Sequence, residues 1–130
     1  MSLARVEAWE AKLREAFDQA DAELEKRHGS RFSRKPHRPA HGEGSTRDAD
    51  GLFDLSVGYT AGFGSAHGEG YVFRVRLATF EPVPGAAREA IEAEALDLLR
   101  ERLAEAFPGR ELSILREGDQ YKIIGDLGLD

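Results

Sequence analysis

The sequence contains no cysteine. This absence excludes disulfide bonds, a thiolate metal site and a cysteine nucleophile. Long hydrophobic runs are also missing, because no stretch approaches the roughly 20 apolar residues that span a membrane and the start of the chain lacks the apolar core of a signal peptide. We therefore expect a cytoplasmic protein that makes no membrane contact. The 130 residues suffice for a single domain, residues 1–130, with a core of its own.

Recognisable catalytic patterns are absent as well. The sequence shows no Ser-His-Asp triad with the strained turn that carries a nucleophile. It also has no pair of carboxylates on an apolar strand, where burial would raise their pKa. We therefore expect no catalytic residues and no cofactor, apart from a divalent metal that the histidines discussed below would bind. The sequence favours a small non-catalytic binding module over an enzyme.

Positive charge is scarce outside one segment. Residues 26–47 hold seven Lys or Arg against a single acidic residue, whereas the whole chain has a net charge of −6, so the remainder sums to −12. The segment has one aromatic residue, Phe32, and no aliphatic side chain larger than alanine. It cannot bury enough apolar area to offset the entropy of ordering it, which predicts a mobile basic loop at about residues 28–50. An anionic partner, either nucleic acid or an acidic protein surface, would suit such a loop, and a solvated linker is the alternative.

Two helical patterns enclose a region with strand periodicity. Apolar residues at three- and four-residue steps predict a first helix that ends at His28-Gly29, and a second helix is expected over about residues 86–107. The apolar face of the first helix holds Leu3, Val6, Trp9, Leu13, Phe17, Ala20 and Leu24. The opposite face is expected to hold Glu7, Arg14, Asp18, Asp21 and Glu25.

Between the helices the hydrophobic period changes to two. Residues 52–59 and 71–77 are predicted as strands joined by a glycine-rich turn, and residues 112–116 and 120–124 form a second hairpin. The order is α-β-β-α-β-β. It indicates an α+β fold with a four-stranded antiparallel sheet and two helices on one face, although the strand order cannot be read from one sequence.

The candidate anion-binding residues are the cations of the basic segment together with two arginines on the polar face of the second strand. They are Arg31, Arg34, Lys35, Arg38, Arg47, Arg74 and Arg76. Guanidinium groups bind phosphates well, and an open sheet face would join the strand arginines to the loop. The alternative for Arg74 and Arg76 is ion pairing with Asp54 or with carboxylates of the later hairpin.

The pentapeptide Ala-His-Gly-Glu-Gly occurs twice, at Ala40–Gly44 and Ala66–Gly70. Two imidazoles and carboxylates are a suitable ligand set for Zn, Mn, Fe or Ni. If the loop folds back towards the hairpin turn, one metal site would assemble from His41, Glu43, His67 and Glu69, with Asp48 and Asp50 as further oxygen ligands. The alternative function is therefore that of a metal-binding protein or a metal-dependent enzyme. The alternative is ordinary loop material, since glycine permits turns and His and Glu tolerate water.

A third interpretation concerns assembly. The apolar stripe around Trp9 would pair helices of two chains if it were exposed, making the protein a structural subunit and a homo-oligomer. The sequence does not decide between this interpretation and a stripe that packs inside one chain.

Overall fold

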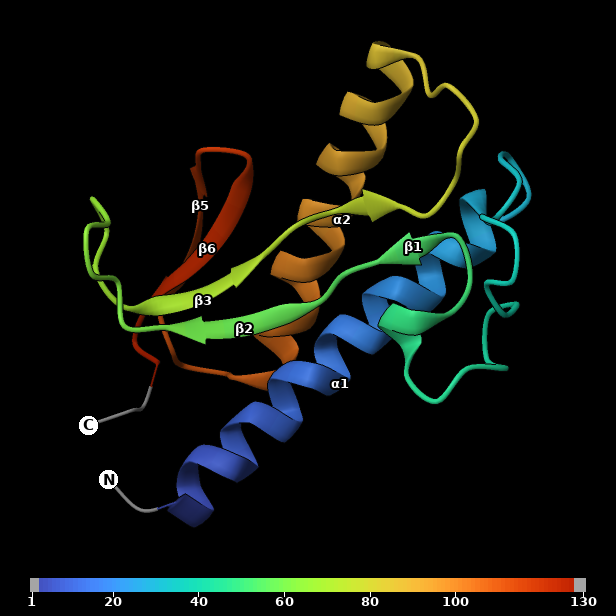
Figure 1. Ribbon diagram of the computed structural model, residues 1–130. Helices are drawn as coiled ribbons and strands as arrows, with labels where there is room; N and C mark the ends of the chain where they lie inside the picture. The colour runs from blue at the N-terminus through green and yellow to red at the C-terminus, as the bar shows by residue number, and fades with distance from the viewer. Residues whose placement is uncertain (1–2, 128–130) are drawn as a thin grey trace.

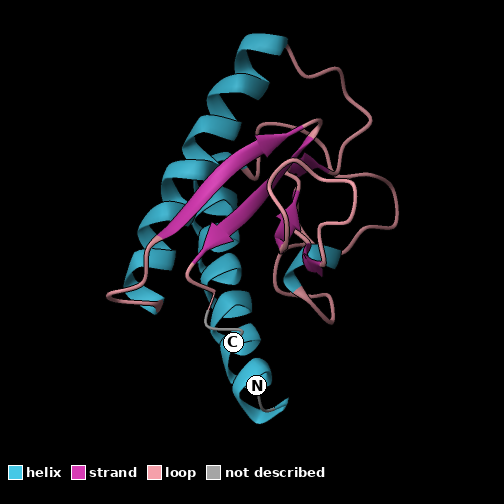
Figure 2. Ribbon diagram, turned by 90° about the vertical axis from the view of Figure 1, so that its left-hand side faces the viewer, coloured by secondary structure: helices cyan, strands magenta, loops and turns pink. Residues whose placement is uncertain are grey.

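The computed structural model describes residues 3–127 and confirms the predicted fold class. Helix α1 (Leu3–His28) and helix α2 (Gly85–Ala106) pack against each other on one side of an antiparallel sheet, as Figures 1 and 2 show. Both helices end where the sequence predicts, because Gly29 follows α1, and Pro108-Gly109 follows α2 closely. No helix in the described part of the chain is long and apolar enough to cross a membrane.

The main sheet has four antiparallel strands in the order β2-β3-β6-β5. Strands β2 (Val57–Thr60) and β3 (Gly70–Phe73) form one hairpin, and β5 (Leu112–Glu117) and β6 (Gln120–Gly125) form the other. The two hairpins join where β3 pairs with β6, with Tyr71 opposite Ile123. This order brings the C-terminal hairpin beside the middle of the chain.

The two long strands predicted for the first hairpin are each interrupted. Short strands β1 (Phe53–Asp54) and β4 (Arg76–Leu77) form a separate two-stranded sheet beyond the main one. Both sheets keep the same register, with Phe53 opposite Leu77 and Val57 opposite Phe73, so no residue is inserted at the break. The ladder opens because the Asp54 carboxylate accepts hydrogen bonds from the Ser56 amide (3.0 Å) and hydroxyl (2.6 Å), which turns the strand locally.

Aromatic side chains from the helices and the sheet form the centre of the core. Trp9 of α1 stacks between Tyr71 of β3, at 4.9 Å between ring centroids, and Phe107, at 4.6 Å. Phe17 meets Phe73 edge to face at 5.1 Å. The apolar stripe of α1 from Trp9 to Leu24 therefore packs inside its own chain, where Trp9 is only 6% exposed, whereas Leu3 at the start of the stripe is 73% exposed.

Segment 29–52 has little regular structure beyond the 3-10 turn η1 (Arg47–Ala49), and a single arginine side chain ties it together. Arg38 donates four hydrogen bonds to backbone carbonyls: from Nε to Gly51 (2.7 Å), and from Nη2 to Asp48 (2.8 Å), Asp50 (3.0 Å) and Phe53 (3.0 Å). These charge-assisted bonds satisfy carbonyls that no strand or helix would satisfy. Arg38 therefore has a structural role at the base of the segment.

Candidate functional site

The predicted basic residues lie along three hollows on the surface, of which the second and third described below share Ser56 and Val57. Four of them, Arg31, Arg34, Lys35 and Arg38, line one hollow of about 720 Å³ that residues 29–38 build with Glu25 and Glu81. Arg74 and Arg76 line a second hollow, at the break between the two sheets. Arg47 lies beside a third hollow, next to α1.

The hollow formed by residues 29–38, the basic hollow, is lined by three exposed cations, of which Arg31 is hydrogen-bonded to His28 Nδ1 at 3.0 Å. Arg34 and Lys35 are exposed, and neither forms an ion pair with any residue between 3 and 127. Lys35 places its Nζ atom 5.1 Å from the ring centroid of Phe80, which is 76% exposed. Glu81, which also lines the hollow, accepts hydrogen bonds from the Ser33 amide (3.1 Å) and hydroxyl (3.2 Å).

A tight turn shapes the mouth of the basic hollow. The Arg38 amide donates to the carbonyl of Lys35 at 3.1 Å, with Pro36 and His37 between them. His37 has φ +69°, a left-handed conformation that is uncommon for a residue with a side chain and that this turn type requires at its third position. His37 is exposed and also lines the hollow, so an imidazole joins the cationic side chains there.

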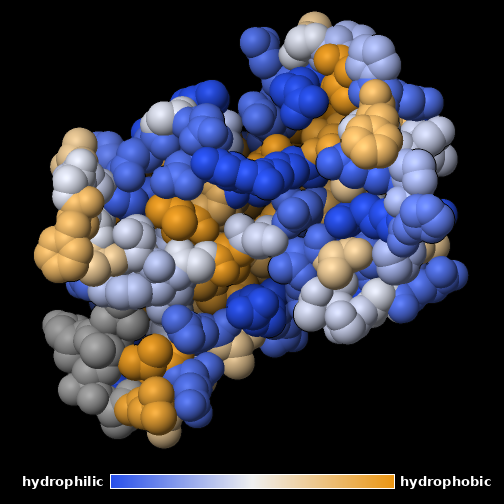
Figure 3. Space-filling view, viewed as in Figure 1, coloured by the Kyte–Doolittle hydropathy of each residue, from blue (hydrophilic) through white to orange (hydrophobic). Residues whose placement is uncertain are grey.

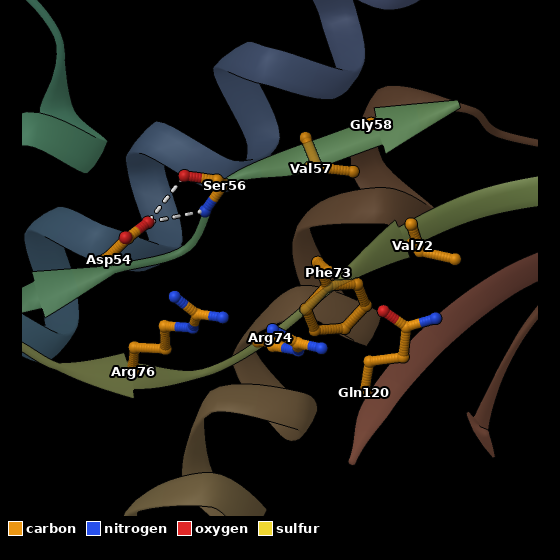
Figure 4. Close-up of a pocket in the computed structure, with 9 residues that line it drawn as sticks. All are labelled: Asp54, Ser56, Val57, Gly58, Val72, Phe73, Arg74, Arg76 and Gln120. Carbon is orange, nitrogen blue, oxygen red and sulfur yellow. Dashed lines mark hydrogen bonds between the residues drawn. The ribbon is translucent and has the colours of Figure 1, made fainter. Parts of the chain in front are cut away.

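The opening between the two sheets places the strand arginines together. Figure 4 shows Arg74 and Arg76 projecting into the gap that faces Asp54 and Ser56. Arg74 forms an ion pair with Asp119, in the turn between β5 and β6, at 3.2 Å, which is one of the pairings that the sequence suggested. This hollow shares no lining residue with the basic hollow, so the two do not form the continuous anion-binding surface proposed from the sequence.

Arg47 is engaged within the protein. Its guanidinium donates to the carbonyl of Gly44 at 2.7 Å and pairs with the carboxylate of Asp50 at 3.0 Å. The carboxylate of Asp50 is fully buried and also accepts hydrogen bonds from the amides of Gly42 and Gly44, both at 3.0 Å. Arg47 therefore neutralises a buried carboxylate and helps to hold the first Ala-His-Gly-Glu-Gly segment.

The two copies of the pentapeptide do not meet. In Figure 1 the loop between β2 and β3, which carries the second copy, lies at one end of the molecule, and the cyan segment 29–50 lies at the other. His67 is exposed in this loop, and Glu69 accepts a hydrogen bond from the Tyr59 hydroxyl at 2.8 Å. Glu43 is exposed on the other side. The structure therefore does not assemble His41, Glu43, His67 and Glu69 around one ion.

His41 instead lies against acidic side chains of α1. Its Nδ1 atom is 3.8 Å from Asp21 Oδ1 and 3.6 Å from Asp50 Oδ1. Within residues 3–127, the one group of three or more potential metal ligands with mutually close donor atoms is Asp21, Glu25 and His41. We name Asp21, Glu25, His41 and Asp50 the α1 acidic cluster.

Asp21 corrects an expectation from the sequence. It was assigned to the polar face of α1, yet its side chain is only 2% exposed. The signal was present, because Asp21 lies four residues after Phe17 and three before Leu24, both of which are in the apolar stripe. Burial, followed by the nearby carboxylates of Glu25 and Asp50, raises the pKa of Asp21 to about 8, so the side chain is mostly protonated at neutral pH.

A second buried charge, Lys122, was not anticipated. This β6 lysine is completely buried, because the loop between β2 and β3 folds over the outer face of the sheet. Its Nζ atom donates to Ser65 Oγ (2.5 Å) and the Gly68 carbonyl (2.8 Å), and it pairs with Glu117 at 3.0 Å. Strand alternation predicts an outward-facing lysine here, and only the loop above it explains the burial.

Hydrophilic side chains cover most of the face seen in Figure 3, with apolar residues showing in patches between them. Four large hydrophobic side chains are exposed within residues 3–127. Two of them, Leu3 at the start of α1 and the half-exposed Tyr59, lie on regular elements, and the other two are phenylalanines in loops. Phe63 is 96% exposed at the loop between β2 and β3, and Phe80 is the ring beside Lys35. Phe80 does not line the basic hollow itself, but through Lys35 its exposed ring lies beside the accessible cations of the hollow.

Comparison with known proteins places the chain in a family for which no activity is described. Residues 4–125 match the model of a family described as "Uncharacterised protein". A Borreliella burgdorferi protein, also described as "Uncharacterized protein", is 30% identical over 125 residues, which cover 96% of this chain and 98% of the relative. No solved structure matches the chain. Since the match extends over nearly the whole sequence, the chain belongs to this uncharacterised family.

Proposed function

We propose that this protein is a non-catalytic binding module that takes single-stranded nucleic acid at the basic hollow. The observation that carries the proposal is the grouping of Arg34 and Lys35, two exposed cations without an ion-pair partner in residues 3–127, with the exposed ring of Phe80. Cations that follow a phosphate backbone and an aromatic ring on which a base stacks are the usual parts of a single-strand binding site.

The exposed ring favours nucleic acid over an acidic protein surface. A carboxylate-rich partner would engage the cations, whereas the 76% exposed ring beside them also offers a face on which a base can stack. Stacking of a base on such a ring contributes roughly 1–3 kcal/mol. Phe80 is therefore the residue that distinguishes the two classes of anionic partner.

Charge elsewhere limits the strength and the extent of binding. Outside residues 26–47 the chain carries a net charge of −12, which repels a phosphate backbone that leaves the hollow. Arg38 and Arg47 are committed to backbone carbonyls and to Asp50, so they add little to the contact. We therefore expect a short footprint and binding that weakens steeply as salt rises.

The test is fluorescence anisotropy of labelled single-stranded RNA and DNA, titrated with intact protein over a range of salt concentrations. The double variant Arg34→Gln/Lys35→Gln should weaken binding at least about tenfold and reduce the slope of log K against log salt by about 1.4, since each single-strand phosphate contact contributes about 0.7. Phe80→Ala should weaken binding with an unchanged slope, because stacking releases no counterions.

The matched control is Lys12→Gln/Arg100→Gln, which removes the same charge from exposed helical positions away from the basic hollow. It should leave affinity within about twofold of the wild type. No binding at low salt, or an equal loss in the control, would overturn the proposal. Binding of polyglutamate in place of nucleic acid would assign the hollow to an acidic protein partner instead.

A further inference from the structure

Two buried carboxylate oxygens in the α1 acidic cluster accept no hydrogen bond. They are Asp21 Oδ1 and Asp50 Oδ1, on side chains that are 2% and 0% exposed. Both face His41 Nδ1, at 3.8 and 3.6 Å, which is beyond hydrogen-bond length. A buried carboxylate without a partner is costly, so native proteins normally supply a donor or a cation.

We propose that Asp21, Glu25 and His41, with Asp50 beside them, form a binding site for one divalent transition-metal ion. The donor atoms of the first three residues all lie within 4.8 Å of one another. Ligands that each stand about 2.1 Å from a zinc-type ion are themselves roughly 3–4 Å apart, so small side-chain adjustments suffice. Asp50 Oδ1, 3.6 Å from His41 Nδ1, offers a fourth ligand atom.

The protein backbone holds these ligands in place from two directions. Asp21 and Glu25 are one helical turn apart on α1, so their side chains project from the same side of a rigid element. Glu25 Oε1 accepts hydrogen bonds from the amides of Leu52 (2.5 Å) and Phe53 (3.0 Å), which leaves its second oxygen for a cation. Asp50 is oriented by the Gly42 and Gly44 amides through its Oδ2 atom.

The local charges favour a dication. Three carboxylates, Asp21, Glu25 and Asp50, are opposed by Arg47, which pairs with Asp50, and by Arg38 nearby. When all three are ionised and His41 is neutral, the cluster carries a net charge of about −1, with Asp18 adding further negative charge. His41 is the solvent-facing member of the cluster, because its side chain is 31% exposed whereas that of Asp21 is 2% exposed. An ion and its remaining water ligands would enter on the side of His41.

The donor set indicates the class of metal. Imidazole nitrogen suits Zn, Fe and Ni, and carboxylate oxygens suit Mn and Mg, so a site with one nitrogen and several oxygens fits Zn²⁺ or Mn²⁺ best. This site shares His41, and Asp50 as a further oxygen ligand, with the ligand set proposed from the repeated pentapeptide.

The experiment uses untagged full-length protein that has been dialysed against chelator and then titrated with Zn²⁺ or Mn²⁺ by calorimetry, with bound metal counted by mass spectrometry. We expect one ion per chain, a rise in melting temperature, and affinity at least about tenfold lower in Asp21→Asn and in His41→Gln. Glu43→Gln and His67→Gln are the matched controls and should bind as the wild type does.

His41→Gln keeps the test valid if Asp21→Asn fails to fold, because the partly exposed His41 contributes little to the core. Circular dichroism of the metal-free variants checks folding. No stoichiometric binding tighter than a Kd of about 100 µM would overturn the proposal. An equal loss in His67→Gln would also overturn it, since that result assigns the ion to the two pentapeptides. Arg34 and Lys35 lie outside the cluster, so the nucleic-acid test stands or falls separately.

Discussion

The two Ala-His-Gly-Glu-Gly segments have identical sequences and different surroundings. In the first copy, His41 lies beside buried carboxylates of α1 and of Asp50. In the second copy, His67 faces solvent, and the Gly68 carbonyl accepts a hydrogen bond from the buried ammonium of Lys122. The same five residues thus meet an anionic environment in one place and a cationic one in the other.

The comparison separates local from tertiary causes. The third residue of each copy, Gly42 and Gly68, is left-handed, with φ +90° and +73°. This agreement follows from the pentapeptide itself, because glycine adopts such a conformation at little cost and the flanking residues are the same. Everything that distinguishes the copies comes from residues distant in the sequence, such as Asp21 for the first copy and Lys122 for the second.

The largest expected effect comes from removing the side chain that ties the first copy's segment together. Arg38→Met deletes four hydrogen bonds to carbonyls and leaves those carbonyls short of donors, which should lower the free energy of unfolding by about 3 kcal/mol. Urea denaturation of the wild type and of Arg38→Met measures this loss in the free energy of unfolding. Arg34→Met, at an exposed position in the same segment, should change stability by less than about 0.5 kcal/mol. A loss below about 1 kcal/mol at Arg38 would show that water replaces the guanidinium.

An intermediate effect is expected from the last glycine of each copy. A Cβ atom at Gly70 would stand 2.4 Å from the backbone oxygen of Ile123, whereas at Gly44 the nearest atom would be Asp50 Cβ at 2.9 Å. Gly70→Ala should therefore lower stability by about 2–3 kcal/mol, and Gly44→Ala by about 1 kcal/mol.

The middle glycines provide the control for this pair. Gly42→Ala and Gly68→Ala should each cost about 1 kcal/mol, because the penalty is the left-handed backbone and neither Cβ meets an atom closer than 3.5 Å. Thermal or urea unfolding of all four variants tests the comparison. Equal costs at Gly44 and Gly70 would mean that the sheet moves to accommodate the methyl group.

The smallest effect concerns pH and the second copy. Hydrogen bonds from Lys122 and Ser65 lower the pKa of Glu117 below its usual value of 4.5. A lowered carboxylate pKa contributes stability that is present above 4.5 and lost as pH falls through the folded-state value. Amide NMR signals of residues 65–69 should therefore change with a midpoint below 4.5.

Lys122→Met should move that midpoint upwards, because the ammonium is the largest cause of the shift. Glu117→Gln should abolish the transition at Ser65, whose hydroxyl donates a hydrogen bond to the Glu117 carboxylate at 2.8 Å, while Glu69 stays in the loop as a separate carboxylate. A transition at Ser65 that persists in Glu117→Gln would assign it to another acid, and would contradict the role given to the ion pair.

Much of the fold was predictable, and the prediction failed at identifiable residues. The stripe containing Trp9 and Phe17 predicted α1 correctly because a 3.6-residue period is a strong signal over 26 residues. The strand periodicity predicted β2 and β3 but missed the opening at Ser56, because the hydrogen bonds from its amide and hydroxyl to Asp54 leave no mark on the hydrophobic pattern. Strand order became visible only in the structure.

The candidate sites were predicted less completely. The sequence identified the cations that build the basic hollow, since charge density needs no tertiary information. It did not separate the accessible Arg34 from Arg38, whose guanidinium is bound to backbone carbonyls. It proposed His41 as a metal ligand with Glu43 as its neighbour, and the structure offers Asp21 in place of Glu43.

The sequence by itself determined the α+β order, the helix ends and the apolar stripes, because these depend on periodicity and on the conformational preferences of neighbouring residues. Tertiary structure decided which charges are buried and which side chains meet. Asp21 and Lys122 are polar residues on regular elements, and each is buried because another segment, 40–50 or 61–69, packs over it. Such packing joins residues far apart in the chain, and no local pattern records it.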